Sequence, residues 1–168
     1  MSVDPDDFRR TMRRLAQAVT VVTTRDGDEI AGITVSSFIS VSLEPTLVLI
    51  SIDKDAPSYS LIEASGIFAV NILREDQRFL ADLFAARYPE TADPFSKLSY
   101  RNAVTGAPIL EGGLGFLDCR VRAVHPEGDH TVFVGDVVAV ESQAGRPLLY
   151  RDGHYFRLGE EIKENEKI

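Results

Sequence analysis

The sequence predicts a mainly β protein with helices, arranged as an antiparallel barrel. Three observations support this class. Short apolar segments typical of strands outnumber the helical ones, they lack the regular alternation with helices of a doubly wound sheet, and Asp-Gly pairs mark hairpin turns. The length of 168 residues suits one domain. We therefore expect a single domain over residues 1–168, with its core at about 8–158 and a loose charged tail at 159–168.

Three helices are expected. The first follows Pro5, has aspartates at its positive end, and places Phe8, Met12 and Leu15 on one face. The second, over residues 55–66, has Asp55 as a candidate N-cap, a proline in its first turn and a glycine as terminator. The third is expected within residues 75–88.

About seven strands complete the expected fold. They lie at 19–24, 30–43, 46–52, 67–73, 114–124, 131–142 and 147–158. Asp26-Gly27 predicts a hairpin turn between the first two. The run at 46–52 is almost entirely apolar, so we expect it to be covered on both faces. The polar loop from Arg87 to Asn102 is long enough to suggest a function: it would border a ligand, cover the site or contact a second subunit.

Composition excludes several classes of partner. A formal net charge of −8 argues against binding to nucleic acid or to an anionic membrane surface. No apolar run reaches the ~20 residues that span a bilayer, and the N-terminal segment lacks the apolar stretch of a signal peptide. The single Cys119 allows no internal disulfide, which favours a reducing cytoplasm.

The segment "GITVSSFISVSL", residues 32–43, carries an unusual number of hydroxyl groups for an apolar strand. With a period of two, one face is mostly apolar and the other mostly hydroxyl-bearing. The first holds Ile33, Val35, Ser37, Ile39, Val41 and Leu43; the second holds Thr34, Ser36, Phe38, Ser40 and Ser42. Small hydroxyls suit a neutral, planar, polar ligand. The alternative is an outer face packed under a helix or at a subunit interface.

The next segment, "ISIDKDAPSYSLI", adds a candidate anion site. Ser51, Asp53 and Lys54 lie at a strand end, and Pro57 and Ser58 begin a helix. Helix N-termini present free N–H groups and a partial positive charge. A hydroxyl face beside an anion site fits a ligand with a polar ring system and a phosphate. The sequence contains neither a dinucleotide-binding GxGxxG after a strand nor a P-loop.

Four segments together resemble a known family. They are "GITVSSFISVSLEPTLVLISI", "FAVNIL", "GDHTVFVG" and "PLLYRDGHYFRL". In order and spacing they are similar to the short-chain flavin reductases, the reductase components of two-component flavin-dependent monooxygenases. The resemblance runs from about Phe8 to Leu158. It implies a split barrel of the FMN-binding type, usually a homodimer. The implied reaction is hydride transfer from NADH or NADPH to FMN or FAD, after which the reduced flavin leaves for a partner monooxygenase.

The resemblance also implies roles for individual residues. For the isoalloxazine ring and ribityl chain it implies Thr34, Val35, Ser36 and Ser37. For the ring edge and phosphate region it implies Ser51, Ile52, Asp53, Lys54 and Ser58. Asn71 is implied beside the flavin, and Phe84 and Ala85 near the dinucleotide end of FAD. His130 is implied in nicotinamide binding and hydride transfer, and Asp152, Gly153, His154 and Tyr155 in holding the nicotinamide cofactor.

Such a reaction needs positioning more than acid–base chemistry, because the cofactors carry out the bond-making. No Ser-His-Asp arrangement is expected, and the spacing of the histidines and of Cys119 gives no metal signature. An exposed turn is the alternative for His130 and His154. His125 is expected to be structural, and Cys119 to be a small buried apolar residue.

Three functional hypotheses remain open from the sequence. The first is an NADH- or NADPH-dependent flavin reductase. The second is a non-enzymatic protein of the same fold that keeps flavin for storage or electron relay. The third, a purely structural β-barrel interaction domain, leaves the hydroxyl-bearing face unexplained.

Overall fold

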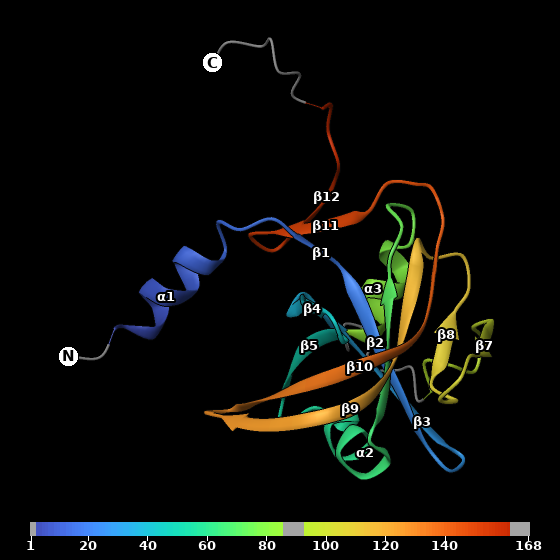
Figure 1. Ribbon diagram of the computed structural model, residues 1–168. Coiled ribbons are helices and arrows are strands. Elements are labelled where there is room, and N and C mark those ends of the chain that lie inside the picture. The colour runs from blue at the N-terminus through green and yellow to red at the C-terminus, as the bar shows by residue number, and fades with distance from the viewer. Residues whose placement is uncertain (1–2, 86–92, 162–168) are drawn as a thin grey trace.

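The computed structural model describes residues 3–85 and 93–161. Its centre is a seven-stranded antiparallel sheet with the order β3-β2-β6-β9-β10-β5-β4 (Figure 1). In chain order these strands are β2 (Thr20–Asp26), β3 (Glu29–Val35), β4 (Phe38–Leu43), β5 (Thr46–Asp53), β6 (Ile67–Ile72), β9 (Gly115–Glu127) and β10 (His130–Ser142). The mainly β class is confirmed.

Two smaller sheets lie beside the main one. The first consists of β1 (Gln17–Ala18), β11 (Leu148–Arg151) and β12 (His154–Arg157), and the second of β7 (Tyr100–Asn102) and β8 (Pro108–Leu110). The expected strand at 147–158 is therefore a hairpin. Strands β1, β7 and β8 were not predicted, because two or three residues are too few for a periodic pattern.

The sheet is not closed by hydrogen bonds into a complete barrel. Strands β3 and β4 form its two edges, although only Ser36 and Ser37 separate them in the chain. We expected a closed barrel because the strands follow one another in hairpins. A succession of hairpins indicates which strands are neighbours along the chain, but it does not show that the two edge strands of the sheet pair with each other.

The described residues form three helices: α1 (Pro5–Met12), α2 (Pro57–Ser65) and α3 (Arg78–Phe84). Asp4 caps α1 by accepting hydrogen bonds from the backbone of Asp6 and Asp7. Both of these aspartates lie in the first turn, which confirms the predicted acidic start. The helix ends before Leu15, so the expected apolar stripe is shorter. The third helix was expected within residues 75–88 but begins only at Arg78. Residues 86–88 of the expected range lie outside the described residues.

The second helix corrects one prediction and confirms another. Ala56 is its N-cap, whereas Asp55 uses its backbone N–H to contact the Asp53 carboxylate at 2.9 Å. Asp55 fails as a cap because the helix begins one residue later than expected. Gly66 ends the helix in the left-handed conformation, with φ of 65°, as predicted.

The expected strand at 30–43 is broken in the middle. It ends at Val35 and resumes at Phe38, and the alternation does not continue across the break. Phe38 packs against the core, while Ile39 and Val41 are exposed, the reverse of the predicted faces. The reason is local: Ser36 and Ser37 leave the strand geometry, and a period of two is preserved only within a continuous strand.

The core has separate parts on the two faces of the sheet. Val22 packs with Ile62 of α2 in one buried cluster, and Val21 packs with Phe84 of α3 in another. Strand β5 buries Val48, Ile50 and Ile52, but its alternate residues are only partly covered. The prediction that β5 is covered on both faces is therefore wrong for the isolated chain.

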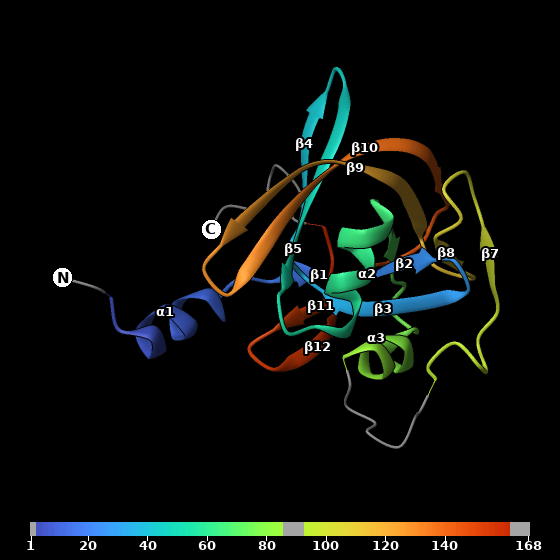
Figure 2. The same cartoon turned by 90° about the horizontal axis from the view of Figure 1, so that it is seen from below.

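Helix α1 lies apart from the sheets in both views (Figures 1 and 2), and none of its described residues is buried. Phe8 and Met12 on this helix are 59% and 43% exposed. Over residues 3–85 and 93–161, no helix is long and apolar enough to cross a membrane. Of the expected tail, residues 159–161 are exposed and irregular.

Candidate active site

A cavity of about 190 Å³ lies where β3, α3 and the β11–β12 hairpin meet. Its lining residues are Val19, Thr34, Val35, Ser36, Ala85, Tyr150 and Tyr155. Five of the seven belong to the residues predicted for cofactor binding. The structure thus brings together residues implied for the flavin, on β3, and a residue implied for the nicotinamide, on β12.

The β3 wall is held against α3. Thr34 Oγ1 donates a hydrogen bond of 2.8 Å to the carbonyl oxygen of Ala81. Gly32 permits this approach, because a Cβ atom there would lie 2.7 Å from the Phe84 ring. Ser36 follows the strand, and its hydroxyl has no protein partner within the described ranges. The Thr34 side chain therefore secures the wall, and Ser36 Oγ remains available to a ligand.

The opposite wall consists of two aromatic rings. Tyr150 and Tyr155 face each other across the β11–β12 hairpin, with ring centroids 5.4 Å apart and an interplanar angle of 63°. The turn between them is Asp152-Gly153, with φ values of 49° and 84°. A two-residue loop with both φ values positive matches the twist of a hairpin and fixes this register. The wall thus offers the apolar and polarisable surface on which planar rings stack.

A second group of predicted residues gathers at the end of β5 and the tip of the β9–β10 hairpin. His130 lies opposite Asp53 in the ladder. Lys54 fastens this corner: its backbone N–H donates to Asp129 O at 3.1 Å, and Nζ donates to Gly128 O at 2.6 Å. The lysine charge is thus held at the hairpin tip.

Asp129 orients the ring of His130. Its Oδ1 lies 2.7 Å from His130 Nδ1, which assigns the proton of that bond to Nδ1 and leaves Nε2 for other contacts. The hydrogen bond from His130 and its charge hold the pKa of the Asp129 carboxyl below its usual range. The His130 side chain is 43% exposed, so it is accessible to a ligand.

Serines connect this corner with the start of β4. Ser37 Oγ donates to Ser51 O at 2.7 Å, and the backbone N–H of Ser51 donates to Ser37 O at 3.2 Å. The Ser37 hydroxyl is therefore engaged by the protein. Ser58, in the first turn of α2, is 1% exposed, and its Oγ has no hydrogen-bond partner among the described residues. A buried hydroxyl without a partner is costly unless a ligand or water satisfies it.

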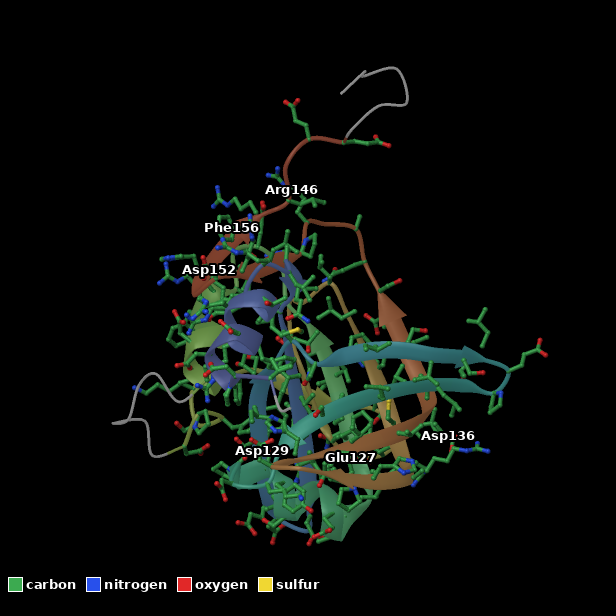
Figure 3. All side chains as sticks on the ribbon, turned by 90° about the vertical axis from the view of Figure 1, so that its left-hand side faces the viewer. Glu127, Asp129, Asp136, Arg146, Asp152 and Phe156 are labelled. Atoms are coloured by element: carbon green, nitrogen blue, oxygen red, sulfur yellow. The ribbon has the colours of Figure 1, made fainter. Side chains whose placement is uncertain are left out.

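The two groups are separated within one chain. Figure 3 shows Asp129 at one hairpin tip and Asp152 at another, on different parts of the same face. Asp152 lines a neighbouring hollow of about 260 Å³ together with residues of α1. Ser36 and Tyr150 line both this hollow and the first cavity, so the two are adjacent. His130 lines neither of these two hollows.

Besides Ser58, three predicted residues lie in the interior. Asn71 is 2% exposed, donates to Val21 O and Thr23 Oγ1 at 3.1 Å each, and accepts from the Leu110 N–H at 2.8 Å. Its side chain therefore fastens β8 to the main sheet. Ile52 and Phe84 belong to the two core clusters, and neither side chain lines the cavity.

Two residues of the lining were missed from the sequence. Tyr150 could have been found, because the two-residue Asp152-Gly153 loop makes it the cross-strand partner of Tyr155. Val19 gave no such signal: it is placed by long-range backbone bonds, from its N–H to Leu148 O and from the Leu73 N–H to its carbonyl.

No group of three or more potential metal ligands gathers within the described residues. What the two groups offer instead is hydroxyls, aromatic faces, a lysine and a histidine. These groups suit organic ring systems and phosphates.

Comparisons with known proteins agree on one family. Residues 12–159 match the flavin reductase like domain. The chain is 39% identical over 156 residues to "Flavin-dependent monooxygenase, reductase subunit HsaB" of Mycobacterium tuberculosis, covering 91% of this chain and 82% of that protein. It is 38% identical over 161 residues to "NADH-dependent flavin reductase" of Rhodococcus sp., covering 93% and 88%.

A solved structure gives the same result. "Streptomyces globisporus C-1027 NADH:FAD oxidoreductase SgcE6 in complex with NAD and FAD fragments" superposes with a TM-score of 0.87 and 34% identity. The match covers 97% of this chain and 99% of that one. The chain therefore belongs to the flavin reductase-like domain family.

Proposed function

We propose that the protein is an NADH- or NADPH-dependent flavin reductase that supplies reduced flavin to a partner monooxygenase. The observation that carries this proposal is the cavity between β3 and the β11–β12 hairpin. It joins Thr34, Val35 and Ser36, implied for flavin, to Tyr155, implied for nicotinamide. The names of related proteins support NADH, FMN and FAD as cofactors and a monooxygenase as the consumer of the product.

When both cofactors are bound, a hydride passes from the nicotinamide to the isoalloxazine ring. The chain contributes position. Ser36 Oγ offers a hydrogen bond to the polar edge of a ring, and Tyr155 and Tyr150 offer aromatic surface. No residue need act as a proton donor for this transfer, because stacking at van der Waals distance is the main requirement.

The cavity fits part of a cofactor. Its volume of about 190 Å³ is below the ~300–1,000 Å³ of pockets that enclose a whole drug-sized ligand. A ring system held there would keep its ribityl and nucleotide parts outside the cavity. A flavin that is only partly enclosed in this way fits the proposal that reduced flavin leaves the protein for a partner monooxygenase.

We assign the phosphate region to α2 and the corner beside it. The unpartnered Ser58 hydroxyl is in the first turn of this helix, whose N–H groups favour an anion. Lys54 supplies a positive charge two residues before the N-cap, Ala56. Asp53 and His130 flank this corner, and we propose that His130 Nε2 contacts the nicotinamide of bound NADH.

We also propose that the enzyme is a homodimer that uses the outer face of the main sheet. Ile39, Leu49, Val134 and Ala123 form one row across β4, β5, β10 and β9, on the side opposite the buried Ile50. Ile39 is 57% exposed. An apolar row across four strands is unusual on a solvent face, and a second copy that covered it would account for it.

The remaining expectations belong to the same proposal. The order of strands, with its two edges joined through Ser36 and Ser37, supports a split barrel forming one domain. A cytoplasmic location would provide the reduced nicotinamide that the reaction consumes.

The test is NADH and NADPH oxidation, followed at 340 nm with no flavin, with FMN and with FAD. Oxidation that requires added flavin and saturates with it supports the reductase and identifies its flavin. A protein that binds flavin but oxidises neither nucleotide would be the non-enzymatic flavin carrier. A protein that binds no flavin would contradict both.

A further inference from the structure

We infer that Asp82 of α3 is a positioning residue that holds the Tyr155 ring in the cavity wall and so determines how tightly the planar cofactors bind. This inference rests on the proposed function, because it names a residue that acts on the same site. Asp82 is not among the site residues predicted from the sequence.

Asp82 is an unusual residue for the inside of this short helix. It is 6% exposed, within the helical turn that also contains Ala81 and Leu83, both buried. A carboxylate loses hydration on burial and is retained only with strong partners. The positions of those partners therefore indicate what the carboxylate does.

The first partner is the cavity wall itself. Tyr155 donates its hydroxyl hydrogen to Asp82 Oδ1 at 2.9 Å. A hydrogen bond from a hydroxyl to a charged carboxylate is stronger than one between neutral groups. The tip of the tyrosine ring is therefore anchored to the helix.

The second partner, Arg78, contacts both Asp82 and Tyr155. Arg78, one turn earlier on α3, donates from Nε to Asp82 Oδ2 at 3.2 Å, and its Cζ lies 5.3 Å from the centre of the Tyr155 ring. The guanidinium thus neutralises the buried carboxylate and also contacts the ring through a cation–π interaction. Tyr155 is held at its hydroxyl by Asp82 and at its ring by Arg78.

The two walls of the cavity are consequently set by consecutive residues of one helix. Ala81 receives the hydrogen bond from Thr34 of the β3 wall, and Asp82 receives the bond from Tyr155 of the hairpin wall. Strand β11 is held by β1 and by backbone hydrogen bonds of Leu148 with Val19 and Leu73, whereas β12, which carries Tyr155, is the outer strand of this sheet. The Asp82–Tyr155 bond therefore adds a constraint on the strand of the wall that has a sheet neighbour on one side only.

The consequence for binding follows from this geometry. The Tyr155 hydroxyl is directed to the helix, so a cofactor meets the ring surface of this residue. Loss of the anchor would let the ring turn and the hairpin move, which increases the conformational freedom that a bound ring must remove. The bond-making steps would change less, because Asp82 does not line the cavity.

The experiment compares four variants of the intact protein: Asp82→Asn, Asp82→Ala, Tyr155→Phe, and the double variant Asp82→Ala/Tyr155→Phe. Flavin affinity is measured by quenching of flavin fluorescence, and KM and kcat are measured for NADH. We expect Tyr155→Phe and Asp82→Ala each to weaken flavin binding or raise the KM for NADH roughly ten-fold, with kcat changed less than three-fold. Asp82→Asn, whose amide oxygen still accepts the hydroxyl, should recover part of the loss.

The double variant distinguishes an action through Tyr155 from general damage. If Asp82 acts through the Tyr155 ring, the loss of affinity in the double variant should be no larger than the larger of the two losses in the single variants. Asp118→Asn is the matched control, since Asp118 is a fully buried carboxylate that accepts from the Val104 and Thr105 N–H groups away from the cavity. It should lower thermal stability without changing flavin affinity or KM.

Tyr100→Phe is the matched control for the loss of a hydroxyl, because Tyr100 does not line the cavity. Unchanged binding and KM in Tyr155→Phe, or losses that add in the double variant, would overturn the inference. If Asp82→Ala does not fold, Asp82→Asn and Tyr155→Phe decide the question. Failure of the wild-type protein to oxidise NADH with any flavin would instead refute the proposed function, and flavin binding by the variants would still test the wall.

Discussion

Thr34 Oγ1 donates a 2.8 Å hydrogen bond to the Ala81 carbonyl oxygen, which also accepts the backbone N–H of Ala85. The same threonine lines the cavity, as does Ala85. Thr34 therefore both holds β3 against α3 through its hydroxyl and forms part of the cavity wall.

Replacing Thr34 with valine should separate these two effects. The change keeps the shape but removes the hydroxyl, so we expect a loss of about 1 kcal/mol in the free energy of unfolding and weaker flavin binding by several-fold. Thr34→Ser, which keeps the hydroxyl, should retain most of both. Urea unfolding and flavin titration measure the two quantities.

Thr24→Val provides the control for Thr34→Val. Thr24 Oγ1 donates to Ile67 O at 2.8 Å, a bond of the same length, and Thr24 does not line the cavity. The Thr24→Val variant should lose about as much free energy of unfolding as Thr34→Val but should keep the flavin affinity of the wild type. Equal flavin affinity in Thr34→Val and the wild type would show that the β3 wall does not contact flavin.

His130→Gln tests the other predicted group. We expect kcat/KM for NADH to fall on the order of ten-fold, equivalent to about 1.4 kcal/mol, because a contact to the nicotinamide would be lost. His125→Gln is the control, since His125 is an exposed residue of the same hairpin. Equal effects of the two substitutions on steady-state NADH oxidation would assign His130 to an ordinary turn.

Much of the β3–β4 region could be predicted from its sequence, and the failure there has a local cause. The period of two placed Ile33 and Thr34 on opposite faces of β3, and in the structure Ile33 packs against the buried cluster of Val22 while Thr34 lines the cavity. It could not show that Ser36 and Ser37 leave the strand, because their side chains continue the alternation. The exposed Ile39 was therefore assigned to the wrong face.

The interior role of Asn71 illustrates a different limit. A polar residue within an apolar strand can face a ligand or a buried backbone, and both give the same sequence pattern. The three hydrogen bonds of Asn71 to Val21, Thr23 and Leu110 depend on strands distant in sequence. Asp82 was missed for the same reason, since its partner Tyr155 lies 73 positions away.

Ile39→Lys should disrupt the proposed homodimer. Ile39 lies in the apolar row on the outer face of β4, where a lysine would place a charge against the second copy. We expect the dimer dissociation constant to rise at least ten-fold, as measured by analytical ultracentrifugation. Val104→Lys is the control, because Val104 is similarly exposed, at 59%, on a loop outside the row. A wild-type monomer, or an Ile39→Lys dimer of unchanged affinity, would contradict this interface.

Cys119 should be chemically inert in the folded protein. It is fully buried, and burial, with the nearby Asp118 and Asp136 carboxylates, raises the pKa of its thiol to about 12. Because the thiolate is the reactive form, a thiol reagent such as DTNB at pH 8 should not react with the native protein on the timescale of minutes. One thiol per chain should react in denaturant. Rapid reaction of the native protein would show that β9 opens readily.

The same shift predicts a dependence of stability on alkaline pH. The folded pKa of Cys119, about 12, lies above the ordinary value of 9.0, so the folded state resists losing this proton. The contribution of the thiol to stability is therefore complete below pH 9 and is lost progressively as the pH rises towards 12. Cys119→Ala should be less stable at pH 7, because it removes a buried sulfur, but should lose less stability than the wild type between pH 9 and pH 11. Urea unfolding of both proteins across this range measures the difference, and parallel pH profiles would show that Cys119 does not titrate with unfolding.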